Sequence, residues 1–317
     1  KNPNGTFSIT PSWITEENDA GKTVYSLDNN CGVFAGATYD WQILNGEAVV
    51  ASGTFETSAG DPIENGDMSQ WCETKEMLPL FGSKKITVWY PGSSWSDSTP
   101  GFWDSSNNAG NKTACTQDKT KNASCAWLQA SGVSLVGALA SGSLFTGTFT
   151  YANMNGTASF GQKYKYTARP TALRLKYHAT LGTVNYNKHN GPLEKDKDIM
   201  DQCSFTVCIV DWDTRHDVQS GTSAPKGIWD PITMGELPVD KQNGIIGYGV
   251  KYSSENTPGT DLIPLEIPIK YYQQTNAAPD GENKFTIIIS VSTSRYGDYL
   301  NGCDKNKIYV VDFEWVY

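Results

Sequence analysis

Hydrophobic and polar residues alternate one by one through many short stretches of the chain, a pattern that predicts β-strands with one buried face. The stretch from 285 to 317 contains two such strands, joined by a polar connector. The core face of its last strand is predicted to hold the odd-numbered residues Tyr309, Val311, Phe313, Trp315 and Tyr317. The connector bears glycines and must run over the surface, where we expect Arg295 and Asp298 to fix the loop as a pair rather than to clamp a ligand.

Two further strands indicate which sheet positions are exposed. In the stretch from 171 to 178, Arg174, Lys176 and His178 alternate with apolar residues, and such a row favours a solvated face over a ligand-facing one. Pro264 and Pro268 share one face of a later strand and cannot donate to a ladder, which favours an edge strand. Because no stretch of useful length shows a helical period, the chain is predicted to be all-β.

The N-terminal region is predicted to form a small β unit. Asn45-Gly46 joins two alternating runs, which is a strong signal for a hairpin. Residues 1–60 are short for a sandwich of roughly 100 residues, so we interpret them as an appended hairpin unit or a truncated immunoglobulin-like module. A break in composition at 58–62 then starts the second domain, 61–317. Its short strands and long loops predict a two-sheet β-sandwich of jelly-roll type.

Composition narrows the class of protein. Hydrophobic residues make up 38% of the 317 residues, enough for a sizeable core, and the low charged fraction of 19% is typical of turn-rich β-proteins. A net charge of -9 without a basic patch argues against nucleic acid as a partner. The chain has no run of about 20 apolar residues that could span a membrane. We expect a mature secreted protein, or one anchored to lipid through a removed N-terminus.

The seven cysteines cannot all pair within one chain. Cys115 and Cys125 lie in one loop and form the most favoured disulfide. Cys203 and Cys208 are expected to be small buried hydrophobic residues on opposite faces of one strand. Three histidines without a C-x-x-C motif give little support to a zinc site.

Several stretches resemble a known family. R-P-T-A-L-R-L-K-Y at 169–177, S-T-S-R-Y-G-D-Y-L-N-G at 292–302, I-Y-V-V-D-F-E-W-V-Y at 308–317 and L-F-T-G-T-F at 144–149 are similar to the putative carbohydrate-metabolism domain of gut Bacteroidetes surface lipoproteins. I-E-N-G-D-M-S-Q-W at 63–71 resembles the opening of many jelly-roll carbohydrate-binding modules. The resemblance implies a jelly-roll fold, an outer-membrane lipoprotein at the cell surface, and a role related to glycans.

The long loop after residue 90 holds the residues that we expect to bind a sugar. Sugars stack their C–H faces on aromatic rings and need planar polar partners for their hydroxyls. The loop supplies Trp95, Phe102, Trp103, Asp104 and Asn107, and Trp212 and Trp229 are second candidates. Alternatively, these aromatic side chains close the end of the sandwich or belong to its core.

We therefore expect an extracellular protein that binds a polysaccharide or oligosaccharide without cleaving it, in glycan capture or utilisation at the cell surface. The first alternative is a glycoside hydrolase, which needs two carboxylates roughly 5 to 10 Å apart. Its possible members are Asp201, Asp211, Asp213, Asp312 and Glu314. The second alternative is a structural or adhesion protein of the surface. A serine hydrolase has less support, because the chain has no G-x-S-x-G elbow.

No cofactor is expected, with calcium as the alternative. Jelly-roll sugar-binding modules often carry a calcium ion between their first and last strands, and Asp67 and Asp312 are the matching positions. The resembled family usually shows two aspartates in its last strand, whereas this chain has only Asp312 there, which weakens the metal proposal. An aspartate in a solvated turn explains Asp67 equally well.

Overall fold

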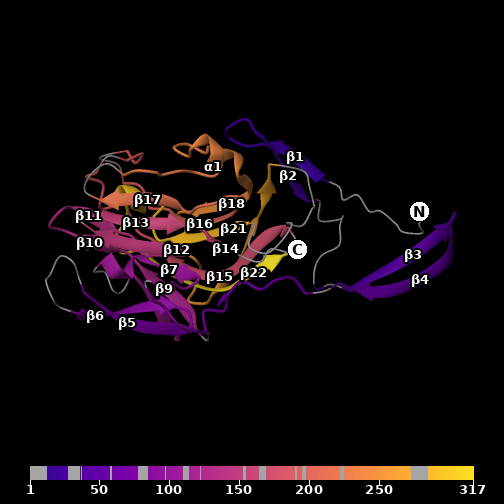
Figure 1. Ribbon diagram of the computed structural model, residues 1–317, viewed down its shortest axis with the longest axis horizontal. Helices are drawn as coiled ribbons and strands as arrows, with labels where there is room; N and C mark the ends of the chain where they lie inside the picture. The colour runs from indigo at the N-terminus through magenta and orange to yellow at the C-terminus, as the bar shows by residue number, and fades with distance from the viewer. Residues whose placement is uncertain are drawn as a thin grey trace.

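The computed structural model describes residues 13–27, 36, 38–57, 59–77, 85–96, 98–109, 114–121, 123–152, 155–163, 169–189, 191–194, 198–221, 225–272 and 285–317. These residues are nearly all in strands or loops, and neighbouring strands run antiparallel. Two sheets face each other, so the all-β sandwich fold is as predicted (Figure 1). No helix in this part of the chain is long and apolar enough to cross a membrane.

The large sheet contains, in order, β1 (Trp13–Glu17), β2 (Thr23–Leu27), β20 (Lys270–Tyr271), β18 (Ile245–Ser253), β16 (Cys203–Val210), β21 (Thr286–Ser292), β12 (Ser143–Ala152), β13 (Asn155–Phe160) and β17 (His216–Gly221). Two short strands extend it, β14 (Gln162–Lys163) beside β21 and β7 (Trp103–Asp104) beside β12. The small sheet has the order β19 (Ile263–Pro268), β15 (Ala172–Thr180), β22 (Lys307–Val316), β9 (Cys125–Gln129) and β8 (Cys115–Asp118). β19 is an edge strand, as its two prolines predicted.

The remaining elements are short. Three hairpins form separate two-stranded sheets: β3 (Thr38–Asn45) with β4 (Ala48–Glu56), β5 (Trp71–Met77) with β6 (Lys85–Pro91), and β10 (Ser131–Val133) with β11 (Ala138–Ala140). The helical elements are α1 (Val239–Asn243) and the 3-10 turns η1 (Ser106–Ala109) and η2 (Gly297–Tyr299). Helices therefore contribute little to the core of the described chain.

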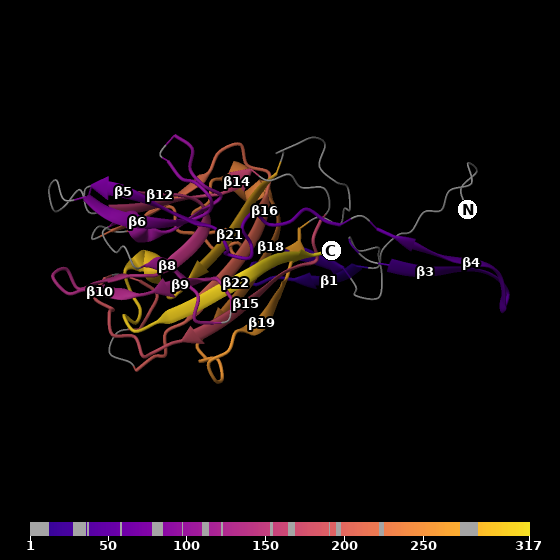
Figure 2. The same ribbon diagram turned by 90° about the horizontal axis from the view of Figure 1, so that it is seen from below.

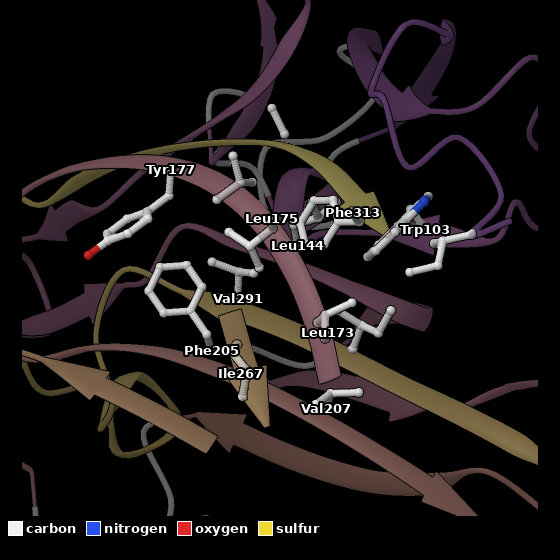
Figure 3. Packing of buried hydrophobic residues seen from close by; sticks show 14 of the residues in the cluster. Trp103, Leu144, Leu173, Leu175, Tyr177, Phe205, Val207, Ile267, Val291 and Phe313 are labelled. Atoms are coloured by element: carbon white, nitrogen blue, oxygen red, sulfur yellow. The ribbon is translucent and has the colours of Figure 1, made fainter. Parts of the chain in front are cut away.

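The main core lies between the two sheets. Leu173, Leu175 and Tyr177 of β15 point inward, as the alternation predicted, and lie near Phe205 and Val207 of β16 (Figure 3). Tyr177 meets Phe205 edge to face, with ring centroids 5.0 Å apart. Burial of each side chain of this size contributes about 1.5–3 kcal/mol, so this interface is the main source of stability.

The outer face of β15 carries solvated charges at Arg174 and Lys176, as the sequence predicted. His178 was expected in the same solvated row but is buried, and its Nδ1 shares a hydrogen bond with Thr257 Oγ1 at 2.6 Å. Arg174 pairs with Glu266 at 2.9 Å and with Glu314 at 3.2 Å. Lys176 pairs with Asp312 at 2.9 Å. All five side chains are exposed, and ion pairs of this kind contribute about 0–1 kcal/mol each.

The last strand, β22, contains a β-bulge that the alternation did not predict. Arg174 lies opposite Glu314 and Lys176 opposite Val311, so two residues of β22 occupy the space beside one residue of β15. The bulged residue, Asp312, has a left-handed backbone with φ of 57°. The bulge exchanges the two faces of the strand, because side chains alternate with a period of two.

The exchange of faces in β22 divides the predicted core residues into two groups. Before the bulge, Ile308 and Val310 face the core, and Tyr309 lies on the outer face, where its ring stacks on Trp127 at 5.5 Å. After the bulge, Phe313 and Trp315 face the core as predicted. The core assignment of Tyr309 was therefore wrong.

A second apolar cluster covers the other face of the large sheet. Cys208, Val210 and Ile288 point into it, and the loop around Met234 and Leu237 packs over them. β16 and β21 are thus buried on both faces, which explains their continuous apolar sequences. The prediction that Cys203 and Cys208 are buried on opposite faces is confirmed, since Cys203 belongs to the main core.

The predicted disulfide between Cys115 and Cys125 does not form. Both thiols are free and buried, as are the other cysteines of the described chain apart from the partly buried Cys72. Antiparallel pairing places Cys115 opposite Leu128 and Cys125 opposite Asp118, so the two cysteines lie at different levels of the hairpin. Burial raises the pKa of the Cys125 thiol to about 12.

The predicted hairpin at Asn45-Gly46 is present as β3 and β4, with Gly46 at φ of 64°. It extends away from the sandwich, whereas β1 and β2 join the edge of the large sheet through β20 (Figures 1 and 2). One face of the hairpin carries apolar side chains that remain open to solvent, including Trp41 at 39% and Phe55 at 41% exposure. The domain division at residue 60 stays a prediction.

Candidate functional site

A groove lies between the turn at 61–70 and the end of β22. Its volume is about 400 Å³, and we call it the terminal groove. The turn contributes Asp61, Pro62, Ile63, Asn65, Gly66, Asp67, Ser69 and Gln70, and β22 contributes Phe313, Glu314 and Trp315. This volume lies within the range of about 300–1,000 Å³ that is typical of small-molecule sites.

The turn is held in shape by its own side chains. Asn65 has a left-handed backbone with φ of 48°, and its side chain forms two hydrogen bonds with Gln70. Asn65 Nδ2 donates to Gln70 O at 3.0 Å, and Gln70 N donates to Asn65 Oδ1 at 2.9 Å. Asp67 Oδ1 accepts from the backbone N–H and the hydroxyl of Ser69 at 3.2 and 2.9 Å. Met68 is fully buried and anchors the turn in the core.

The bulge in β22 provides the docking point for this turn. Phe313 N donates to Gly66 O at 2.9 Å. A Cβ atom on residue 66 would lie 2.3 Å from Phe313 O, so the close approach requires glycine. Trp103 supports the turn from its buried side. Trp103 Nε1 donates to Glu64 O at 2.7 Å, and the Trp103 ring lies 5.0 Å from the ring of Phe313.

The terminal groove combines an apolar base with a polar rim. Ile63, Phe313 and Trp315 are buried members of the main core. Asp67 and Glu314 are exposed, and no lysine, arginine or histidine is among the described residues that line the groove. Carboxylates accept hydrogen bonds from hydroxyls, and amides both accept and donate them. Arg174 offsets the charge of Glu314, and the charge of Asp67 on the rim disfavours an anionic ligand. The groove therefore suits a neutral ligand rich in hydroxyl groups.

Four of the predicted ligand-binding residues are buried beneath the surface. Phe102 is 8% exposed, and Trp103, Asp104 and Asn107 are fully buried. Asp104 Oδ2 accepts from Phe149 N at 2.7 Å. Asn107 is held on both sides of its amide by the backbone of residue 115, with Oδ1 accepting from N at 2.8 Å and Nδ2 donating to O at 2.6 Å. These contacts correspond to the alternative interpretation, in which the loop packs against the core.

Trp95 is the member of the loop that keeps a partly exposed ring. It stacks on Tyr90 with centroids 4.0 Å apart and planes at 7°. The loop begins beside the terminal groove, because Gly92 N donates to Gln70 O at 2.8 Å. Trp95 therefore belongs to the same region of the surface as the groove.

Trp212 and Trp229 lie elsewhere, in and against the second apolar cluster. Their rings meet edge to face at 5.6 Å, and Trp212 Nε1 donates to Lys241 O at 2.7 Å. Trp212 is buried, while Trp229 is partly exposed. The structure does not bring these two residues to the terminal groove.

The two residues considered for calcium have different surroundings. Asp67 lines the terminal groove, whereas Asp312 in the bulge pairs with Lys176 at 2.9 Å. The ammonium group of Lys176 opposes a second cation at Asp312. Within the described ranges, no group of three or more His, Cys, Asp or Glu side chains is placed to hold a metal ion. A calcium ion at this position stays the alternative to the expectation of no cofactor.

Asp201, one of the carboxylates considered for hydrolysis, organises the connector before β22. Its Oδ2 accepts from Ser294 Oγ at 2.6 Å, from Cys303 N at 2.7 Å and from Asn306 Nδ2 at 2.7 Å. Burial raises the pKa of Asp201, and these hydrogen bonds work in the opposite direction. Its donors fix the loop, which gives Asp201 a structural role.

The predicted pair of Arg295 and Asp298 does not form. Arg295 Nη1 donates instead to Gln202 Oε1 at 3.1 Å. Two other candidates for hydrolysis, Asp211 and Asp213, are exposed. Sequence reasoning missed Asn65, Gln70 and Trp315 as lining residues, although the N-G-D-M-S-Q-W stretch gave a signal for the turn.

The model of the family described as putative carbohydrate metabolism domain matches residues 55–316. No curated protein matches the chain. A putative glycoside hydrolase from Bacteroides thetaiotaomicron VPI-5482 is similar in structure, with 14% identity, a TM-score of 0.47, and coverage of 99% of this chain and 94% of that chain. One from Bacteroides vulgatus ATCC 8482 has 14% identity, a TM-score of 0.49, and coverage of 77% and 96%. Because both TM-scores are below 0.5, neither likeness supports an argument about function.

Proposed function

The chain belongs to the putative carbohydrate metabolism domain family, and we propose that its terminal groove binds a neutral glycan without cleaving it. The observation that carries the proposal is the composition of the groove. Its apolar base includes Trp315, and its rim offers the carboxylates of Asp67 and Glu314 together with the amide of Gln70. Aromatic and aliphatic surface suits the C–H face of a sugar ring, while carboxylates and amides suit its hydroxyls.

Binding without hydrolysis is supported by the engagement of the carboxylates. A glycoside hydrolase uses two carboxyl groups that flank the scissile bond, one of which acts as a proton donor or acceptor. Glu314 is held by Arg174 at 3.2 Å, and Asp67 Oδ1 is held by Ser69 within the turn. Both groups can still accept a hydrogen bond from a sugar hydroxyl, because each oxygen has two lone pairs.

The proposal includes an extracellular location at the cell surface, where the protein captures polysaccharide. The support for this part is the resemblance to surface lipoproteins stated from the sequence. A lipid anchor and a role in glycan utilisation belong to the same proposal.

Affinity electrophoresis in gels containing xyloglucan, galactomannan, arabinoxylan or mixed-linkage β-glucan tests the proposal. Wild type should be retarded by at least one of these neutral polysaccharides. Gln70→Ala and Glu314→Gln should each weaken binding about 10-fold, as expected for one lost hydrogen bond to a charged or well-placed group. Gln42→Ala and Glu17→Gln are matched controls at exposed positions outside the groove and should bind as wild type.

Two results would overturn the proposed function. One is retardation that survives both groove substitutions unchanged. The other is release of reducing sugar from the retained polysaccharide, which would show cleavage. Trp95→Ala tests whether the adjacent loop extends the groove, and we expect it to weaken binding to long polymers more than to short oligosaccharides.

A further inference from the structure

The guanidinium group of Arg295, in the connector between β21 and β22, lies over the ring of Tyr252 in β18. Its central carbon is 3.8 Å from the Tyr252 ring centroid and 5.1 Å from that of Tyr296. Gln202 holds both the backbone and the side chain of Arg295. Arg295 N donates to Gln202 O at 2.6 Å, and Arg295 Nη1 donates to Gln202 Oε1 at 3.1 Å. Stacking and this anchor together fix the direction of the fork.

Most of the donors on this fork are unused. Arg295 Nε and Nη2 have no hydrogen-bond partner among the described residues, and Arg295, Tyr252 and Tyr296 are all partly exposed. An arginine whose only task is to fix a loop would direct these N–H groups at backbone carbonyls. Asp201 already fixes the connector, because its carboxylate accepts hydrogen bonds from Ser294, Cys303 and Asn306.

Tyr252 links Arg295 to an acceptor, the carboxylate of Asp230. Tyr252 OH donates to Asp230 Oδ2 at 3.0 Å, and Asp230 Oδ1 accepts from Ile232 N at 2.7 Å. Burial and the charge of Asp230 raise the pKa of Tyr252 well above its usual value, so the phenol keeps its proton. The group of Arg295, Tyr252, Asp230 and Tyr296, which we call the arginine cluster, thus offers donors and acceptors with no net charge.

This balance of charge decides which ligand the arginine cluster suits. A carboxylate or phosphate would meet the Arg295 fork but would be repelled by Asp230. A neutral sugar has no such penalty, and its neighbouring hydroxyls both donate and accept, so a pair of them can bridge Arg295 and Asp230. The ring of Tyr296 supplies the apolar surface on which a C–H face can rest.

We propose that the arginine cluster is a second binding site for neutral saccharides. The proposal rests on the function proposed above, because it assigns the same class of ligand to a separate place. A polysaccharide long enough to reach both sites would gain avidity, whereas a di- or trisaccharide occupies one.

The test isolates the second site by disabling the first. In the double variant Gln70→Ala, Glu314→Gln, residual binding to the polysaccharide that retards wild type should persist, at least 10-fold weaker. Adding Arg295→Lys should abolish that residual binding, because lysine keeps the charge and loses the planar fork. Adding Asp230→Asn should weaken it, and adding Lys251→Arg, an exposed conservative change on β18, should leave it unchanged.

The outcomes separate the two proposals. If the double variant of the groove shows no residual binding, or if Arg295→Lys does not reduce it, the second site is refuted while the groove proposal stands. If wild type binds none of the neutral polysaccharides, both are refuted. If polygalacturonate is retained in preference to the neutral polymers and Arg295→Lys removes this retention, the cluster binds anions and the assignment to neutral sugars is refuted. Thermal unfolding of each variant shows whether any loss comes from misfolding.

Discussion

Replacing Asp298 with asparagine is expected to stabilise the protein at neutral pH. Surrounding protein withdraws this carboxyl from water and raises its pKa from 3.8 to about 6. Described residues donate no hydrogen bond to the carboxylate of Asp298 in compensation, and its neighbour Tyr299 lies edge to face with Tyr296. The charged form is therefore unfavourable in the folded state.

The raised pKa of Asp298 determines how the stability of the protein changes with pH. Folding favours the protonated carboxyl, so its contribution to stability is complete below pH 3.8 and is lost as the pH rises through about 6. The shift from 3.8 to about 6 corresponds to at most about 3 kcal/mol, because one pKa unit equals about 1.4 kcal/mol. Asp298 keeps some exposure to water, which screens its charge, and we expect about 1–3 kcal/mol.

Urea unfolding of wild type and Asp298→Asn at two pH values measures this difference. At pH 7.5 the variant should have the higher free energy of unfolding by about 1–3 kcal/mol, and at pH 4 the difference should fall below about 1 kcal/mol. Asp213→Asn, at an exposed position, is the matched control and should show no such dependence. A variant of Asp298 that is no more stable than wild type at pH 7.5 would refute the reasoning.

Three further predictions follow from burial and exposure. Gly66→Ala should lower the free energy of unfolding by about 2–4 kcal/mol, measured by urea unfolding, because a Cβ atom would lie 2.3 Å from Phe313 O; an unchanged value would show that the turn moves freely. Amide hydrogens of β3 and β4 should exchange with solvent much faster than those of β15, since an isolated hairpin is marginally stable; equal protection in mass spectrometry would contradict this. Cys115 and Cys208, both fully buried, should react with an aromatic disulfide reagent only after unfolding, and rapid labelling of either in the native protein would contradict their burial.

The parts of the fold that could be predicted depend on local chemistry. Asn45-Gly46 predicts a tight turn, and the structure has the hairpin of β3 and β4 there. The two prolines on one face of β19 predict an edge strand, and β19 lies at the edge of the small sheet. The faces of β15 were also correct, because strict alternation of Leu173, Leu175 and Tyr177 is not interrupted there. Each of these inferences depends only on residues that are close together in the sequence.

The parts that could not be predicted depend on contacts between distant segments. The bulge in β22 depends on the contacts of this strand with β15 and with the turn at 61–70. The alternation of apolar and polar residues cannot reveal that one residue of the strand is extra. The terminal groove joins residues 61–70 with residues 313–315, which are more than 240 positions apart in the sequence. Trp103 looked exposed because its sequence neighbours are polar, yet it fills the space beneath that turn.

The bulge at Asp312 determines which residues at the end of the last strand face the core. If the strand kept Asp312 but ran on without the bulge, strict alternation would turn Phe313 and Trp315 to the outside and direct Glu314 into the core. An alignment with an unbulged strand that omits the gap at this position would assign every later residue of β22 to the wrong side of the sheet, so the bulged position is the reference point for aligning the end of the chain.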